Sequence, residues 1–257
     1  MPETNPNDQE LSFLEHLVEL RSRLLKACAA ILLILLALLP FSRKLYGWLS
    51  APLTAVLPDG SSMIAIDVAS PFLTPFKLAL LLSLILAIPI VIYQLWAFVA
   101  PALYRQEKRL ARPLLYSSVI LFYAGCAFAY FVVFPLVFGF FTRVAPEGVT
   151  VMTDISKYLD FVMTLFLAFG VAFEVPIATI ILVATGMTTI DQLTRARGYI
   201  VVGAFALGML LTPPDVISQT LLALPIWLLF ECGIVMSRIL LPHRKSKPEA
   251  PADQATS

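Results

Sequence analysis

The sequence predicts an all-α integral membrane protein with six transmembrane helices, the last two short, and an N-terminal amphipathic helix. Two observations carry this prediction. The chain is 59% hydrophobic and 14% charged, with a mean hydropathy of +0.87, whereas about a quarter of the residues of a soluble domain are charged. The apolar residues also gather in runs long enough, or nearly long enough, to cross a bilayer.

The N-terminal segment, residues 1–23, is polar and comes before the apolar runs. Within residues 9–23, apolar side chains recur at helical spacing: Leu11, Leu14, Leu17 and Val18. We therefore expect a short amphipathic helix at the membrane surface. Its polar face either contacts a partner or is solvated, with Glu19 paired to Arg23 one turn later. Because the segment lacks the basic start and cleavage site of a signal peptide, we expect it to be retained.

Six apolar runs follow between residues 24 and 241, which we interpret as one transmembrane domain. The runs are residues 24–39, 76–99, 114–141, 158–184, 199–211 and 216–241. The fifth run is shorter than the roughly 20 residues of a comfortable crossing, and polar residues interrupt the sixth. The alternative is a four-span protein in which residues 199–241 form a re-entrant hairpin. Residues 242–257 are polar and predict a disordered cytoplasmic tail.

Between the runs lie a structured loop with short helical pieces at residues 40–75 and a short polar loop at 142–157. The stretch from Phe98 to Pro113, FVAPALYRQEKRLARP, is predicted to be a charged loop in which four cations surround Glu107.

With six spans, both termini lie on the same side of the membrane. Most lysine and arginine residues lie on that side. They are Arg21, Arg23, Lys26, Arg105, Lys108, Arg109, Arg112, Arg195, Arg197, Arg238, Arg244, Lys245 and Lys247. The opposite side has only Arg43, Lys44, Arg143 and Lys157. By the positive-inside rule, both termini and the loop around Glu107 are cytoplasmic.

The composition also argues against several classes of function. A formal net charge of +1 is not the basic footprint that nucleic-acid binding requires. The three cysteines each sit in an apolar run, without metal-ligand spacing. The two histidines have no triad-like or metal-like neighbours, and there is no glycine-rich phosphate loop. We therefore expect neither an enzyme nor a bound cofactor or metal.

Glu174 is the unexpected polar residue, since it lies within the fourth apolar run just before Val175-Pro176. An ionised, unpaired carboxylate costs several kcal/mol there, so Glu174 should be protonated, hydrated or paired. It has either a functional role or a structural hydrogen bond to a neighbouring helix. Candidate structural partners are Thr164, Gln94 and Gln219. Gln219 and Asp215, at the start of the sixth span, could face the same region.

Several blocks of sequence resemble the TatC family, the polytopic subunit of the twin-arginine protein translocase. They are HLVELRSRL (16–24), SAPL (50–53), IDVASPF (66–72), WAFVAPALYRQEKR (96–109), FAYFVVFPLVFGF (128–140), FGVAFEVP (169–176) and GMLLTPPDVISQTLLALP (208–225). They cover most of residues 10–241 in order, so the resemblance is specific.

The resemblance implies a receptor in the bacterial cytoplasmic (inner) membrane for folded proteins whose signal peptides carry paired arginines. It implies single-span TatA and TatB partners, several copies in a hetero-oligomer, and transport driven by the proton gradient. The signal-binding residues that it implies are Glu19, Glu107, Phe98, Arg21 and Arg23. The intramembrane polar or partner-contact residues that it implies are Glu174, Gln219 and Asp215.

Two other functions remain open at this level. A proton-coupled secondary transporter of small solutes would use Glu174 as its coupling site, although such transporters usually show two related halves, and spans one to three do not resemble four to six. A scaffold that only assembles other membrane proteins is the third alternative.

Overall fold

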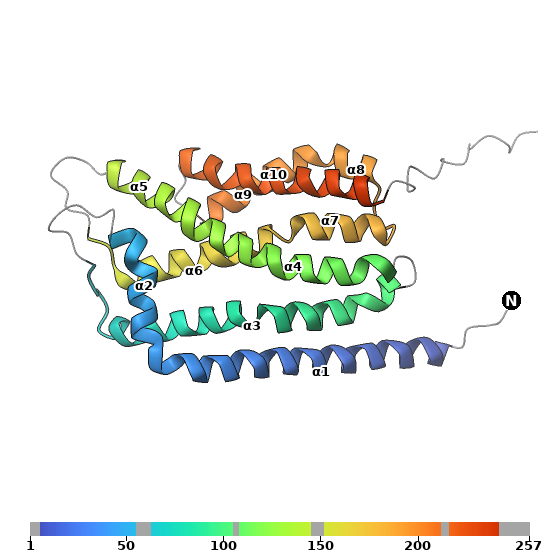
Figure 1. The fold of residues 1–257 in the computed structure, drawn as a ribbon, viewed down its shortest axis with the longest axis horizontal. Helices are drawn as coiled ribbons and strands as arrows, with labels where there is room; N and C mark the ends of the chain where they lie inside the picture. The colour runs from blue at the N-terminus through green and yellow to red at the C-terminus, as the bar shows by residue number, and fades with distance from the viewer. Residues whose placement is uncertain (1–5, 55–62, 105–107, 145–151, 212–215, 242–257) are drawn as a thin grey trace, which may run out of the picture. The chain divides into compact units, whose positions relative to one another are not determined.

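The computed structural model of the chain describes residues 6–54, 63–104, 108–144, 152–211 and 216–241. Almost all of these residues are helical (Figure 1), which confirms the predicted all-α class. The chain forms two compact units, Met1–Glu174 and Val175–Ser257. Each unit has its own core and is described by itself.

The first unit begins with one long helix, α1 (Pro6–Leu38), followed by a 3₁₀ turn (Leu39–Phe41) and α2 (Ser42–Thr54). Pro40 lacks a backbone N–H and ends the regular α-helix. The structure differs from the expected separate surface helix, because residues 9–23 continue without a break into the first apolar run. That run is rich in leucine and alanine, which favour helix, so nothing in the sequence interrupts it. Helix α2 confirms the predicted helical piece in the following loop.

Four further helices complete the first unit: α3 (Ser70–Tyr104), α4 (Lys108–Phe128), α5 (Phe134–Val144) and α6 (Ile155–Ala172). A π-helical turn, Ala129–Val133, joins α4 to α5. Pro135 has no N–H to donate to the carbonyl of Phe131, which gives a local reason for the wider turn. The third predicted span is therefore one continuous helical path with a bulge in its middle.

The predicted loop from Phe98 to Pro113 is largely helical, which corrects the sequence-based boundary. Helix α3 continues to Tyr104 and α4 begins at Lys108. Leucine, alanine and arginine are all good helix formers, so the helices extend into the charged stretch. Glu107 itself lies outside the described residues.

Close approach of α4 and α6 holds the core of the first unit together. A Cβ added to Gly125 of α4 would collide with the carbonyl of Phe169, and one added to Gly170 of α6 would lie 2.7 Å from the ring of Phe122. Aromatic rings fill the same interface, as in the Phe128–Phe169 pair at 5.5 Å between ring centroids. Glycine is thus required here for packing rather than for backbone conformation.

The second unit contains α7 (Val175–Ala184), α8 (Ile190–Arg195), α9 (Arg197–Leu211) and α10 (Val216–Leu240). Helix α10 packs against both α7 and α9. A Cβ on Gly233 of α10 would collide with the Thr179 hydroxyl of α7. Thr189 caps α8 through a reciprocal capping box with Gln192.

An ion pair joins the start of α9 to α10. Arg197 Nη2 donates to Glu231 Oε2 at 2.7 Å, and Arg197 Nε lies 2.7 Å from Glu231 Oε1. The first contact is a hydrogen bond and the second only a close charge contact, since Glu231 Oε1 has no hydrogen-bond partner among the described residues. The ion pair gives Glu231, an acid in the last apolar run, a structural partner.

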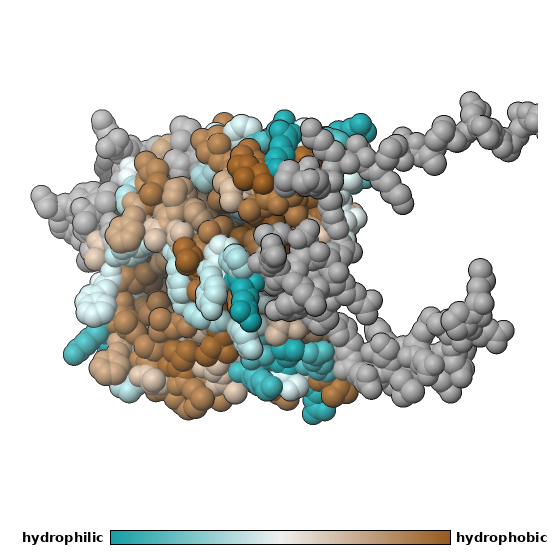
Figure 2. Space-filling view, turned by 45° about the vertical axis from the view of Figure 1, so that its right-hand side comes forward, coloured by the Kyte–Doolittle hydropathy of each residue, from teal (hydrophilic) through white to brown (hydrophobic). Residues whose placement is uncertain are grey.

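Five helical stretches of the described residues are long and apolar enough to cross a membrane. They are Val18–Ala51, Ser70–Phe98, Arg112–Phe140, Ile155–Ala184 and Leu222–Leu240. The fifth predicted run is also helical, but its apolar stretch, Arg197–Met209, is shorter. Many large apolar side chains are exposed, among them Leu33, Ile120 and Val202, and apolar surface covers much of the face in Figure 2. Such a surface suits a lipid environment.

Candidate functional site

The first candidate region lies at one end of the first unit. Figure 1 shows α1 and α3 side by side with opposite chain directions. The N-terminal half of α1 therefore lies at the same end as the C-terminal turns of α3 and the start of α4. Glu19, Arg21 and Arg23 belong to that half of α1, and Phe98 belongs to the last turns of α3.

Glu19 is already engaged within its own helix. Arg23 Nε donates to Glu19 Oε1 at 3.0 Å, and Arg23 Nη2 donates to the same oxygen. Both side chains are partly exposed, and Arg21 is exposed. The predicted pairing of Glu19 with Arg23 is therefore confirmed, and any external cation has to share this carboxylate with Arg23 or displace it.

Two of the predicted site residues, Glu107 and Asp215, lie outside the described residues. Phe98 is half-buried. Their part in a binding site stays a prediction.

The second candidate region is the carboxyl of Glu174, at the end of the first unit. The helix stops at Ala172, and the Glu174 backbone N–H donates to the carbonyl of Val171 at 3.0 Å. The following helix begins at Val175, with Pro176 in its first turn, where the missing N–H costs no hydrogen bond. The break in the fourth span therefore follows from Pro176 and leaves Glu174 at the junction.

The carboxyl group of Glu174 is only partly hydrogen-bonded. Its Oε1 atom is buried and has no hydrogen-bond partner among the described residues. Ser118 of α4 lies near the Glu174 carboxyl, and the indole N–H of Trp96 in α3 donates to Ser118 Oγ at 3.4 Å. Trp96, Ser118 and Glu174 thus form a short polar chain in the first unit.

The structural partners suggested for Glu174 from sequence were wrong in one case. Thr164 donates its hydroxyl to the Asp160 carbonyl of its own helix, at 2.7 Å, as hydroxyls within helices commonly do. Sequence reasoning missed Ser118 and Trp96 because they belong to other spans, and spacing along the chain does not reveal which faces meet.

Gln219 belongs to the second unit and joins two of its helices. Its Nε2 donates to the Phe205 carbonyl of α9 at 3.1 Å. A Cβ added to Gly208 of α9 would lie 3.1 Å from Gln219 Cγ, so the helices approach closely at this point. Gln219 therefore has a structural hydrogen bond, and its role in contacting a partner stays a prediction.

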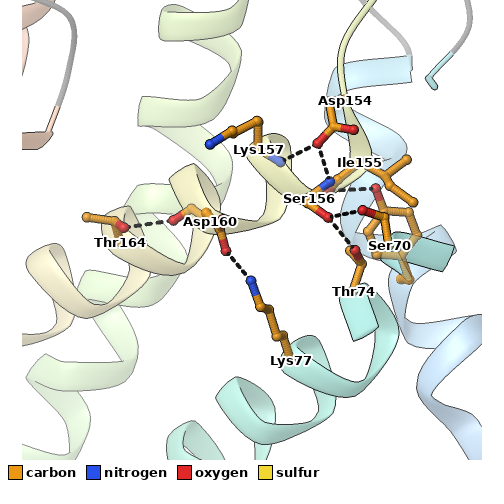
Figure 3. A network of polar contacts seen from close by, with 10 residues as sticks. Ser70, Thr74, Lys77, Asp154, Ile155, Ser156, Lys157, Asp160 and Thr164 are labelled. Atoms are coloured by element: carbon orange, nitrogen blue, oxygen red, sulfur yellow. Dashed lines mark hydrogen bonds and ion pairs between the residues drawn. The ribbon is translucent and has the colours of Figure 1, made fainter. Parts of the chain in front are cut away.

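A third polar region, which sequence reasoning did not single out, lies where α3 and α6 begin (Figure 3). Asp154 caps α6. Its Oδ1 accepts from the N–H groups of Ser156 and Lys157 at 3.0 and 2.9 Å, and its Oδ2 accepts from the N–H of Ile66 at 3.0 Å. The Ile66 bond, then the other backbone bonds and the nearby Lys157 charge, lower the pKa of Asp154 below its ordinary value. An aspartate just before an apolar run is the signal that predicts such a cap.

The hydroxyl of Ser156 extends this region to α3. It donates to Ser70 Oγ at 2.8 Å and lies 2.9 Å from Thr74 Oγ1. Lys77 of α3 donates to Asp160 of α6 at 3.1 Å. These contacts tie the first turns of α3 and α6 together. Within the described part of the chain, no cluster of three histidine, cysteine or acidic side chains could hold a metal ion.

Comparison with known proteins decides the family. The profile of the family described as Sec-independent protein translocase protein (TatC) matches residues 15–225. The chain belongs to the TatC family. A TatC protein of Azotobacter chroococcum is 61% identical over 89% of this chain and 89% of its own length. A TatC protein of Escherichia coli K12 is 57% identical over 91% of each chain. Both are named Sec-independent protein translocase protein TatC.

Solved TatC structures have the same fold. A crystal structure of the twin arginine translocase receptor TatC has a TM-score of 0.78 at 36% identity, and the match covers 87% of this chain and 98% of that one. A second structure, of TatC in the detergent DDM, gives a TM-score of 0.79. The family predicted from sequence is therefore confirmed. TatC proteins are translocase components rather than enzymes, and the secondary-transporter alternative is not supported.

Proposed function

We propose that this TatC-family chain is the receptor and core subunit of a twin-arginine translocase. It binds signal peptides with paired arginines and helps to export folded proteins across the bacterial cytoplasmic membrane, driven by the proton gradient. The observation that carries this proposal is the family match over residues 15–225, together with 36% identity to a solved twin arginine translocase receptor.

The binding site combines two acids, Glu19 and Glu107, with Phe98 and the cations Arg21 and Arg23. Guanidinium is a rigid, planar fork of donors that pairs well with a carboxylate. A ligand with two arginines therefore suits two separate acids. The cations of α1 and of the stretch from Phe98 to Pro113 repel the signal arginines and therefore do not bind them. Their role is to hold this end of the protein in the cytoplasm and to orient the acids.

Glu19 binds a signal arginine by exchange. One oxygen of its carboxylate already accepts two hydrogen bonds from Arg23, so an incoming guanidinium shares the carboxylate with Arg23 or displaces it. An exposed ion pair contributes only about 0.2–1 kcal/mol, and exchange contributes less. Useful affinity then requires the second acid and an apolar contact for the hydrophobic segment of the signal peptide. Phe98, at the end of α3, is the residue we assign to that contact.

The intramembrane polar residues Glu174, Gln219 and Asp215 form the partner-contact region for the single-span TatA and TatB subunits. The incomplete hydrogen bonding of Glu174 Oε1 supports this role, because a partner or water that supplies a donor would gain a bond at no cost elsewhere. Several copies of the chain work with these subunits in a hetero-oligomer. Both termini face the cytoplasm.

Cross-linking in membranes tests the site. A twin-arginine precursor with a photoreactive residue beside its arginines is compared on the wild-type chain and on the Glu19→Ala and Glu107→Ala variants. Each variant is expected to lower cross-linking, and Asp191→Ala, at an exposed acid of α8, is the matched control. Undiminished cross-linking in both glutamate variants would overturn the assignment of the site.

A further inference from the structure

The polar region where α3 and α6 begin contains a cavity of about 290 Å³. Its lining includes Asp67, Ser70, Leu73, Lys77, Ser156 and Lys157. Small-molecule sites in proteins range over about 300–1,000 Å³. The cavity is therefore the size of a compact polar group rather than of a whole lipid or peptide.

The inner wall of the cavity is built from groups that already satisfy one another. Ser70 and Ser156 share a hydrogen bond, and Asp154 accepts from three backbone N–H groups. Lys77 is paired with Asp160 at 3.1 Å, yet its side chain remains 45% exposed (Figure 3). The wall is thus held in place without a ligand.

The charges at the rim are less completely paired. Asp67 and Lys157 are both exposed, and neither side chain has a hydrogen bond or ion pair with another described residue. The cavity therefore presents the unpaired Asp67 carboxylate together with two ammonium groups: that of Lys77, which also pairs with Asp160, and that of Lys157, whose charge lies near Asp154. A complementary ligand carries an anion for the lysines and a cation for Asp67.

The position of the cavity indicates what kind of ligand this is. Two membrane-spanning stretches, Ser70–Phe98 and Ile155–Ala184, both begin beside it. Ile66, which lines the cavity, is 75% exposed, and two apolar residues of the same segment that do not line it are exposed as well: Val68 is 99% and Phe72 73% exposed. Surface of this kind is unfavourable in water but suits the boundary between lipid head groups and acyl chains.

From these observations we propose that the cavity binds the head group of a zwitterionic phospholipid with a primary amine, as in phosphatidylethanolamine. The phosphate contacts Lys77 and Lys157, and the ammonium donates to Asp67. A quaternary ammonium, as in phosphatidylcholine, has no N–H to donate and is recognised by aromatic side chains. None of the described lining residues is aromatic. This site is independent of signal-peptide binding.

Lipid cross-linking tests the proposal. The full-length chain is placed in phosphatidylcholine nanodiscs that contain a small fraction of a photoreactive phosphatidylethanolamine, and labelled peptides are mapped by mass spectrometry. Labelling is expected in the segments around Asp67 and Lys157. Asp67→Asn and Lys157→Gln should each lower it by about two- to fivefold, as expected for an exposed charge contact. Lys44→Gln, at an exposed lysine of α2 that does not line the cavity, should leave it unchanged.

Competition identifies the source of the head group. Unlabelled phosphatidylethanolamine should displace the probe, whereas phosphatidylglycerol, phosphatidylcholine and soluble glycerophosphoethanolamine should not. Displacement by phosphatidylglycerol would mean a simple anion site, and displacement by the soluble head group would mean a free zwitterion, so either would overturn the proposal. Equal labelling of the wild type and both rim variants would also overturn it. If a variant folds poorly, the competition between lipids on the wild-type chain still tests the proposal.

Discussion

Helix α6 has an acidic residue just before its start and another just after its end, and the two differ in how completely their carboxylates are hydrogen-bonded. Asp154, just before the helix, is 8% exposed and accepts three backbone hydrogen bonds. Glu174, just after it, is half-buried and has an oxygen with no hydrogen-bond partner among the described residues. A fully satisfied acid stabilises a fold, whereas an incompletely satisfied one costs stability and is retained for another reason. We therefore propose that Asp154 has a structural role and Glu174 a functional one.

The largest expected effect is on stability, from Asp154→Ala. The change leaves the N–H groups of Ile66, Ser156 and Lys157 without their acceptor, and buried unpaired donors are costly. We expect a clear drop in the yield of folded protein and in its Tm in detergent. Asp154→Asn should be intermediate because it keeps one acceptor oxygen. Asp191→Ala is the control. Equal Tm values for Asp191→Ala and Asp154→Ala would contradict the structural role of Asp154.

The packing around Glu174 is tested by Gly125→Ala. The added methyl group would collide with the carbonyl of Phe169, which precedes Glu174 by five residues. Overpacking of this kind costs roughly 1–3 kcal/mol of unfolding free energy. The matched control is Gly139→Ala, where an added Cβ has no neighbour within 4 Å. Equal stability of the two variants, measured by thermal unfolding, would mean that α4 and α6 do not approach as closely as described.

Glu174 is expected to affect export more than stability. Glu174→Ala should lower export of a twin-arginine substrate by roughly fivefold, the equivalent of about 1 kcal/mol for one hydrogen bond, while its Tm is unchanged or higher. Glu174→Gln keeps a polar group and should export better than Glu174→Ala. Export rates from membrane vesicles and Tm values of the purified variants measure the two effects. A large loss of Tm in Glu174→Ala would place this acid in the same class as Asp154.

The smallest expected effect is the pH dependence that Asp154 contributes to stability. Because the folded state lowers its pKa, its contribution is complete above the ordinary aspartate pKa of about 3.9 and is lost as pH falls through the lower, folded-state value. The Tm difference between wild type and Asp154→Asn should therefore be constant from about pH 5 to 8 and shrink below about pH 4. A difference that instead changes near neutral pH would contradict the assignment.

The sequence predicted the helices better than their contacts. The apolar runs and the position of Pro40 were sufficient for the class of fold and the end of the first run, because length and missing N–H groups act locally. The break beside Glu174 was not predicted, although Pro176 gives a local reason for it. Leucine and alanine in residues 24–39 also explain why the N-terminal helix does not stop at residue 23. The Trp96–Ser118–Glu174 chain and the cavity beside Asp67 were not predictable, because they depend on which helix faces meet.

The most direct test of the receptor assignment is the affinity of the purified chain, in lipid nanodiscs, for a twin-arginine signal peptide and for its twin-lysine version. Lysine presents a point charge and cannot form the planar two-point contact of guanidinium. We expect the twin-arginine peptide to bind more tightly, and we expect the difference to fall when Glu19 and Glu107 are both replaced by alanine. Equal affinity for the two peptides on the wild-type chain would contradict the account.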